Sequence, residues 1–209
     1  MPRLITSALL ALLISSPAHA YKEDKNWPCI QAKVEKLSAG QMWPNLTTKA
    51  DDQSWRDDKT ITALVEQLLP RRTTLEETEK IIKEFAEKHK GPNLNIALEK
   101  TYLGLLTEIN TIRAEIISGI GRFSNRQKVL VKRITESRHK ITDYEKKDIA
   151  GTLTKEEDSQ LVKLEQALEW DQRIHEEREQ SLEFVCEAPV LLEQRLFTLA
   201  RQLQKYTNS

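Results

Sequence analysis

The chain has 209 residues, and its 32 basic side chains balance its 32 acidic side chains, so the formal net charge is zero. This balance argues against a general binder of nucleic acid or anionic membranes, because such proteins carry a basic excess. Charged residues make up 31% of the chain and aromatic residues only 6%, a composition typical of long helices rather than sheets. The length suits one domain, or one domain with an appendage.

Residues 1–20 have the pattern of a secretory signal peptide. Arg3 supplies the positive charge, an apolar run covers residues 4–14, and Ala-His-Ala at residues 18–20 is an Ala-x-Ala cleavage site. The apolar run is too short to span a bilayer. We therefore expect an exported, soluble protein that is cleaved after Ala20, with the bacterial periplasm as the preferred compartment. A eukaryotic secretory route stays open, and there the Asn-Leu-Thr sequon at Asn45 would accept a glycan.

Cys29 and Cys186 are the only cysteines, and both lie in the exported part of the chain. An even pair in an oxidising compartment predicts a disulfide. The loop that it closes would enclose most of the mature chain, and the chain-entropy model assigns it about 5 kcal/mol of stabilisation as an upper figure. The alternative is a reactive or metal-binding thiol pair, which a CxxC motif or clustered histidines would favour; the chain has neither.

Residues 21–57 are predicted to form an irregular strap that contains one short helix. The helix rests on the four- and three-residue spacing of Ile30, Val34 and Leu37, which is typical of an amphipathic face. Residues 38–40, Ser-Ala-Gly, are expected to end it.

Three of the four tryptophans, Trp27, Trp43 and Trp55, belong to this strap, and the fourth is Trp170. One interpretation is that the first three pin the strap onto the helices beside Cys29. The other interpretation is an aromatic patch that contacts a partner or ligand, which requires the rings to be exposed to solvent. In that second interpretation Trp170 is also a partner contact.

Residues 58–93 are predicted to form two short helices. Pro70 closes the first, and the second begins with a capping box of Thr74 and Glu77 and ends at Gly-Pro, residues 91–92. Helices of this length are not stable alone in water. They need a larger apolar surface to pack against.

That surface is predicted in residues 94–206, which have the pattern of a long helical hairpin that turns at residues 150–154. Apolar residues recur at alternating steps of four and three in both arms, as in a coiled coil. In the first arm they are Leu98, Tyr102, Leu105, Ile109, Ile112, Ile116, Ile120, Phe123, Leu130, Ile134, Ile141 and Tyr144. In the second arm they are Leu161, Leu164, Leu168, Ile174, Leu182, Val185, Leu192, Leu196, Leu199, Leu203 and Tyr206. The expected fold is all-α: a long antiparallel, coiled-coil-like hairpin packed at its base by shorter N-terminal helices.

Charge supports one register of the hairpin, in which Ala150 lies opposite Thr154. Residues 122–140 hold seven bases and one acid, and the segment opposite, residues 164–182, holds six acids and two bases. Opposite charges on paired arms are typical of coiled coils. We therefore interpret the basic run as part of the coil rather than as a phosphate-binding surface.

The same register places Cys186 opposite Ser118 and close to Gly119 and Gly121. Because glycine weakens a helix, we expect the strap to approach these two glycines closely. Pro189 is expected to kink or interrupt the second arm. This level of the hairpin is predicted to be the boundary between a globular base and a projecting coil.

No catalytic, cofactor or metal residue emerges from the sequence. The register brings none of the three histidines beyond the signal together, and no zinc-hydrolase, haem, nucleotide or hydrolase motif occurs. Glu108 and Glu115 lie among apolar residues, but a ferritin-like site also needs Glu-x-x-His motifs, which are absent. An enzyme is therefore the least favoured class.

The sequence favours an exported helical binding or scaffolding protein of the cell envelope, non-enzymatic, with a protein partner and no nucleic acid. A homo-oligomer stays open. The first alternative is a periplasmic holdase chaperone that shields unfolded clients. The second is a carrier of a small ligand or metal that uses the tryptophan-rich strap.

Overall fold

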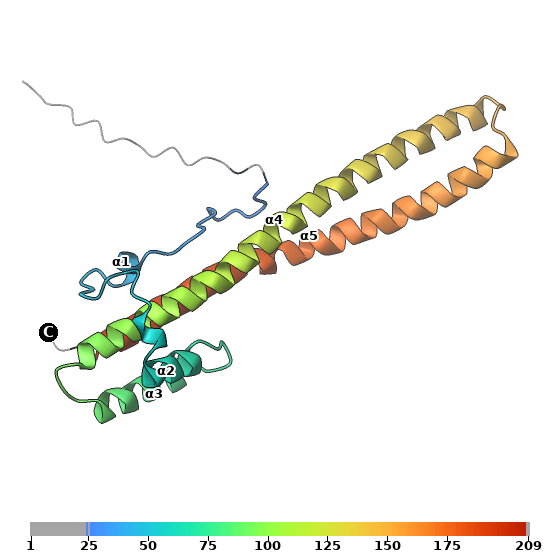
Figure 1. Ribbon diagram of the computed structural model, residues 1–209. Coiled ribbons are helices and arrows are strands. Elements are labelled where there is room, and N and C mark those ends of the chain that lie inside the picture. The colour runs from blue at the N-terminus through green and yellow to red at the C-terminus, as the bar shows by residue number, and fades with distance from the viewer. Residues whose placement is uncertain (1–23, 25, 208–209) are drawn as a thin grey trace, which may run out of the picture.

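The computed structural model describes residues 24 and 26–207, and it contains helices and loops only in that part of the chain. The predicted signal peptide, residues 1–20, lies outside the described residues. The helices are α1 (Ala39–Met42), the short 3₁₀ helix η1 (Ser54–Arg56), α2 (Lys59–Leu68), α3 (Leu75–Lys88), α4 (Leu94–Ile149) and α5 (Lys155–Gln204). The two long helices lie side by side as an antiparallel hairpin (Figure 1), so the predicted fold class is confirmed.

The turn of the hairpin follows local sequence signals. Gly151 has a φ of +68°, the left-handed conformation that favours glycine after a helix end. Thr154 then starts α5 with a capping box: its hydroxyl accepts the Glu157 backbone N–H at 3.2 Å, and the Glu157 carboxylate accepts the Thr154 N–H at 3.0 Å. These local bonds fix where one arm ends and the other begins.

The short helices pack around one half of the hairpin. Helix α2 contacts α4, α3 contacts α5, and α1 contacts α5. Their apolar faces join the large core of the protein, which on the long helices runs from Leu94 to Ile116 and from Leu192 to Tyr206. Figure 1 shows this half as the base and the other half of the hairpin extending beyond it.

One half-buried arginine closes the base between α2 and α3. The guanidinium of Arg195, on α5, donates to the backbone carbonyls of Leu68, Pro70 and Thr73 at 2.7, 2.8 and 3.0 Å. The Leu68 carbonyl ends α2 and has no partner inside the helix, and the other two belong to the loop between α2 and α3, so this side chain ties the helix end to the loop. Burial lowers the pKa of Arg195.

The register of the hairpin agrees with the one derived from charge. Three of the side-chain contacts between the arms join residues equally far from Ala150 and Thr154. They are Arg133–Asp171, Tyr144–Gln160 and Lys147–Glu157. The predicted seam is also present, since Ile120, Leu130, Ile134 and Ile141 are buried along α4.

The predicted helix over Ile30, Val34 and Leu37 is wrong. This segment has no helical structure, and Ser38 is the N-cap of α1 rather than the end of a preceding helix. Side chains of α4 bind the backbone of the segment, and Ile30 is fully exposed. Tertiary hydrogen bonds therefore override the local apolar spacing.

The predicted interruption of the second arm at Pro189 is also wrong, because α5 continues through this residue. Proline removes one backbone hydrogen bond of the helix. Pro189 is buried, the neighbouring Cys186 is covalently anchored, and Leu192 packs in the core. These contacts hold the helix on both sides of the proline.

No helix in residues 24 and 26–207 is both long and apolar enough to cross a membrane.

Candidate functional site

The base ends at the disulfide, and the parts of α4 and α5 between this level and the turn are the free part of the hairpin. We call the level of the disulfide the junction. Cys29 and Cys186 form the predicted bond, with their Cα atoms 5.6 Å apart and 157 positions apart in sequence. The bond fastens the strap to α5 where the core of the base ends. The predicted disulfide is therefore confirmed, and the alternative of a reactive thiol pair does not apply to the bonded form.

Two buried side chains of α4 hold the backbone of the strap. The Asn110 amide accepts the Leu37 N–H at 2.9 Å and donates to the Leu37 carbonyl at 3.0 Å. Three residues on, Arg113 donates to the Val34 carbonyl at 3.2 Å. These hydrogen bonds are formed with backbone groups of the strap and not with its side chains. They therefore hold the strap extended even where its apolar spacing favours a helix.

Arg113 joins three parts of the chain at the junction. Besides Val34, it donates to the Pro189 carbonyl at 3.2 Å and lies 3.7 Å from the Glu193 carboxylate. Desolvation lowers its pKa, partly opposed by the charge of Glu193. Its Nη1 has no hydrogen-bond partner among the described residues. A buried cation held this way ties strap, α4 and α5 into one unit.

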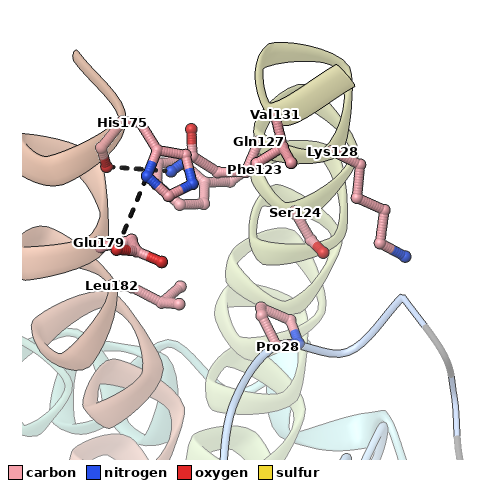
Figure 2. A pocket seen from close by; sticks show the side chains of 9 residues that line it. All are labelled: Pro28, Phe123, Ser124, Gln127, Lys128, Val131, His175, Glu179 and Leu182. Carbon is pink, nitrogen blue, oxygen red and sulfur yellow. Dashed lines mark hydrogen bonds and ion pairs between the residues drawn. The ribbon is translucent and has the colours of Figure 1, made fainter. Parts of the chain in front are cut away.

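A cavity of about 330 Å³ opens on the junction, on the side of the free hairpin (Figure 2). The strap contributes Pro28, and the other walls are side chains of α4 and α5. They are Phe123, Ser124, Gln127, Lys128, Val131, His175, Glu179 and Leu182.

The polar groups of the junction cavity are only partly engaged. Gln127 donates to the His175 carbonyl at 3.5 Å, but its own buried Oε1 has no partner among the described residues. His175 Nδ1 lies 3.7 Å from the Glu179 carboxylate. Lys128 donates to the Asn26 side chain at 2.7 Å. The cavity thus combines apolar walls with one unpaired hydrogen-bond acceptor.

The close approach predicted at Gly119 and Gly121 is wrong. A Cβ at Gly121 would meet no atom within 4 Å, and one at Gly119 would meet only the flexible tip of Arg122 at 3.8 Å. The glycine that packing requires is Gly104, where a Cβ would lie 2.7 Å from Val65 Cγ2 and 3.0 Å from Trp55 Cδ2. At Gly104 the residues that come close to α4 are those of α2 and of η1, the last part of the strap.

Beyond the junction the hairpin packs against itself, and its charge blocks meet at one point. Arg133 binds Asp171 through two hydrogen bonds, in the bidentate geometry that suits guanidinium and carboxylate. No other ion pair joins the two blocks within the described residues. The bases Arg126, Arg138 and Lys140 and the acids Glu165, Glu176 and Glu177 are not ion-paired in that part of the chain.

The tryptophans divide into core and surface. Trp43 and Trp55 are 4% and 3% exposed and belong to the core of the base, so they pin the strap and cannot contact a partner of the folded chain. Trp27 is half-buried and donates to the Gln31 carbonyl at 2.7 Å. Trp170, on the free part of α5, is 62% exposed, with Arg173 over its ring at 5.2 Å. It alone of the four presents most of its surface.

A polar cluster in the base has no counterpart in the sequence expectations. The Glu99 carboxylate is buried and accepts the N–H and hydroxyl groups of both Thr47 and Thr48 at 2.6–3.0 Å. Burial raises the pKa of Glu99, but these hydrogen bonds outweigh it and the net pKa lies below its usual value. The only sequence signal for this cluster is the Thr-Thr pair after Trp-Pro-Asn-Leu, a pattern common in loops that does not indicate a partner.

Metal ligation has no support in the described residues, where no three histidine, cysteine or acidic side chains gather around one point. Glu108, considered above as a ligand, pairs with Arg56 at 3.0 Å. His89 stacks on Phe85 with ring centroids 4.2 Å apart, while His175 lines the junction cavity.

These features define an all-α protein built on a disulfide-fastened helical hairpin whose far half carries exposed apolar side chains. Comparison with protein-family models, with curated proteins and with solved structures found no match.

Proposed function

We propose that this protein is an exported, non-enzymatic binding or scaffolding protein that contacts a protein partner through the free part of its hairpin. One observation carries the proposal. The part of α4 and α5 beyond the disulfide adds nothing to the core of the base, yet it leaves Trp170 62% exposed. A tryptophan that becomes buried in an interface is among the residues that contribute most to protein–protein binding. A tryptophan that is exposed in the folded chain adds little buried apolar area to its core.

The length of the free part of the hairpin supports the proposal. At about 1.5 Å per residue, the stretch of α4 from the junction to the turn extends on the order of 45 Å. The turn end of the hairpin lies far from the base in Figure 1. A partner can therefore bind the hairpin without touching the short helices.

The test compares partner lists from a native cell envelope for three tagged proteins. The first is the full chain. In the second, residues 130–174 are replaced by a short turn, which removes Trp170 and keeps the cut ends opposite each other. The third is a control that lacks residues 137–143 and 161–167, one heptad from each arm, and therefore keeps the seam in phase and Trp170 in place.

Partners held through Trp170 are retained by the full chain and the control and lost by the turn variant. A partner list that is identical for the full chain and the turn variant would overturn the proposal. Far-UV circular dichroism and the intact Cys29–Cys186 bond establish that each protein is folded.

A carrier of a small ligand is the second candidate. The junction cavity favours it because the buried Gln127 Oε1 there lacks a hydrogen-bond partner among residues 24 and 26–207. The ligand would present a hydrogen-bond donor to this oxygen and an apolar body to Phe123 and Leu182. Titration of candidate ligands against the full chain and Gln127→Leu tests it. Equal affinity for both proteins would exclude the cavity as the binding site.

A further inference from the structure

Helix α5 carries a second apolar stripe that faces away from α4. Trp170, Phe184 and Leu191 are 62%, 75% and 39% exposed, and together with Glu177 they occupy positions exactly one heptad apart. Trp170 directly precedes Asp171, which pairs with Arg133 of α4, and Phe184 and Leu191 directly precede the seam residues Val185 and Leu192. The stripe is therefore turned by about 100° from the seam. We call Trp170, Glu177, Phe184 and Leu191 the outer stripe.

Three exposed large apolar side chains at heptad positions, interrupted by one glutamate, form an apolar stripe on which a second helix can pack. The stripe continues past Leu191 into the base. Gln194 and Thr198, the next two positions on the same face, line a groove of about 600 Å³ beside Met42 of α1. Nothing in the described residues covers this path.

We propose that the occupant of the outer stripe is α5 of a second copy of this chain, running antiparallel. This inference rests on the proposed function, since it takes Trp170 as a contact residue and names the partner that covers it. In the antiparallel register centred between Gln180 and Ser181, Trp170 lies opposite the second copy's Leu191 and Glu177 lies opposite its Phe184.

Charge selects this orientation. The antiparallel register brings Arg173 beside the second copy's Glu187, and the two-fold axis repeats the contact. Both side chains are exposed. Arg173 pairs with Glu169 of its own helix at 3.1 Å, and Glu187 has no ion pair within the described residues, so Glu187 is the carboxylate that gains a partner. A parallel pairing would instead place Arg173 on Arg173, Glu177 on Glu177 and Glu187 on Glu187, and like charges so close are unfavourable.

Glu177 has a separate role as the polar member of the stripe. A polar residue at a seam position fixes the register of a coiled coil and lowers its stability. Here the neighbouring donors are Gln180 and Ser181 of the second copy. The dimer is therefore specific and weak, and Glu177→Leu is expected to tighten it.

The experiment is sedimentation-velocity ultracentrifugation of the purified, disulfide-bonded chain from micromolar to millimolar concentration. The full chain forms a reversible dimer. Phe184→Asp weakens the dimer at least about thirtyfold, as loss of an aromatic contact at an interface centre does. Glu177→Leu strengthens it about tenfold. Glu165→Gln, at an exposed position about 140° around the helix from the outer stripe, is the surface control and changes nothing.

A charge exchange separates the antiparallel dimer from other contacts. Arg173→Glu and Glu187→Arg each weaken the dimer about tenfold, and the double variant restores it, since it re-forms the pair with the charges swapped. A monomer over the whole concentration range overturns the inference, and so does a dimer that Phe184→Asp leaves unchanged. Weakening by both single variants without restoration also overturns the antiparallel register.

The inference and the proposed function fail separately. If the chain dimerises but captures no partner from the cell envelope, the inference of a dimer is supported and the proposed binding of another protein is contradicted. If the chain is a monomer and loses its partners when residues 130–174 are replaced, the proposed function is supported and the inference of a dimer is contradicted.

Discussion

Helix α4 contains Gly104, Gly119 and Gly121, and replacing each by alanine tests which of them the packing requires. Glycine inside a helix costs about 1 kcal/mol relative to alanine. The three sites share this local gain on substitution, and they differ in what the new methyl group meets.

At Gly121 the methyl group enters open space, and at Gly119 the nearest atom is 3.8 Å away on a flexible side chain. Each of these substitutions is therefore expected to raise the free energy of unfolding by about 1 kcal/mol. At Gly104 the methyl group would lie 2.7 Å from Val65 and 3.0 Å from Trp55, both buried. Overpacking costs about 1–3 kcal/mol, so the net effect is a loss of up to about 2 kcal/mol.

The assay is urea unfolding of the oxidised protein followed by circular dichroism, with thermal melting as a second measurement. A change of 1 kcal/mol shifts the melting temperature of a chain of this size by roughly 2–4 °C. Gly121→Ala and Gly119→Ala should melt higher than the parent protein, and Gly104→Ala lower. Stabilisation by Gly104→Ala would refute the packing of α2 and η1 on α4, and destabilisation by Gly121→Ala would refute the open space beside Gly121.

Three further substitutions probe the strap and the base. Cys29→Ser opens a loop of 157 positions and should lower the free energy of unfolding by up to about 5 kcal/mol, measured by urea unfolding; an unchanged thiol count and melting temperature would contradict the bond. Arg113→Ala leaves the buried carbonyls of Val34 and Pro189 without this donor and should cost about 3 kcal/mol in the same assay, whereas a loss below about 0.5 kcal/mol would deny it that role. Because the pKa of Glu99 is lower in the folded than in the unfolded chain, this carboxylate contributes stability that is complete above its unfolded-state pKa and is lost as the pH falls through its folded-state pKa. Glu99→Gln should therefore reduce the loss of stability in acid. An unchanged dependence of stability on acid pH would assign that loss to other groups.

The hairpin could be predicted in detail because its information is local. Spacing of apolar residues fixes which face of each arm is buried, and the capping box of Thr154 with Glu157 fixes the start of the second arm. Once the turn is placed, every opposite pair follows by counting, and Arg133 therefore meets Asp171. The disulfide needed only the number of cysteines and the compartment.

The strap could not be predicted, because what shapes it lies far away in the sequence. Ile30, Val34 and Leu37 have helical spacing, yet Asn110 and Arg113 bind the backbone of this segment from α4. Apolar spacing predicts a helix only where no other partner satisfies the backbone.

The same reason accounts for the glycines and the buried carboxylate. The packing at Gly104 comes from η1 and α2, which precede α4 by many residues, and the hydrogen bonds to Glu99 come from Thr47 and Thr48. Nothing near Gly104 distinguishes it from Gly121. Glu99 belongs to a helix with many exposed glutamates, so the sequence around it predicts a solvent-exposed helix face.

The Cys29–Cys186 bond also determines how the molecule transmits tension. A pull applied to the chain before Cys29 and after Cys186 passes directly through the two sulfur atoms. The shorter helices α1 to α3, all of α4 and the first part of α5 lie inside the covalent ring and carry none of that load along their backbone. The hairpin can therefore keep its shape while the ends of the chain are under force, and reduction of this single bond places the whole ring in the line of tension.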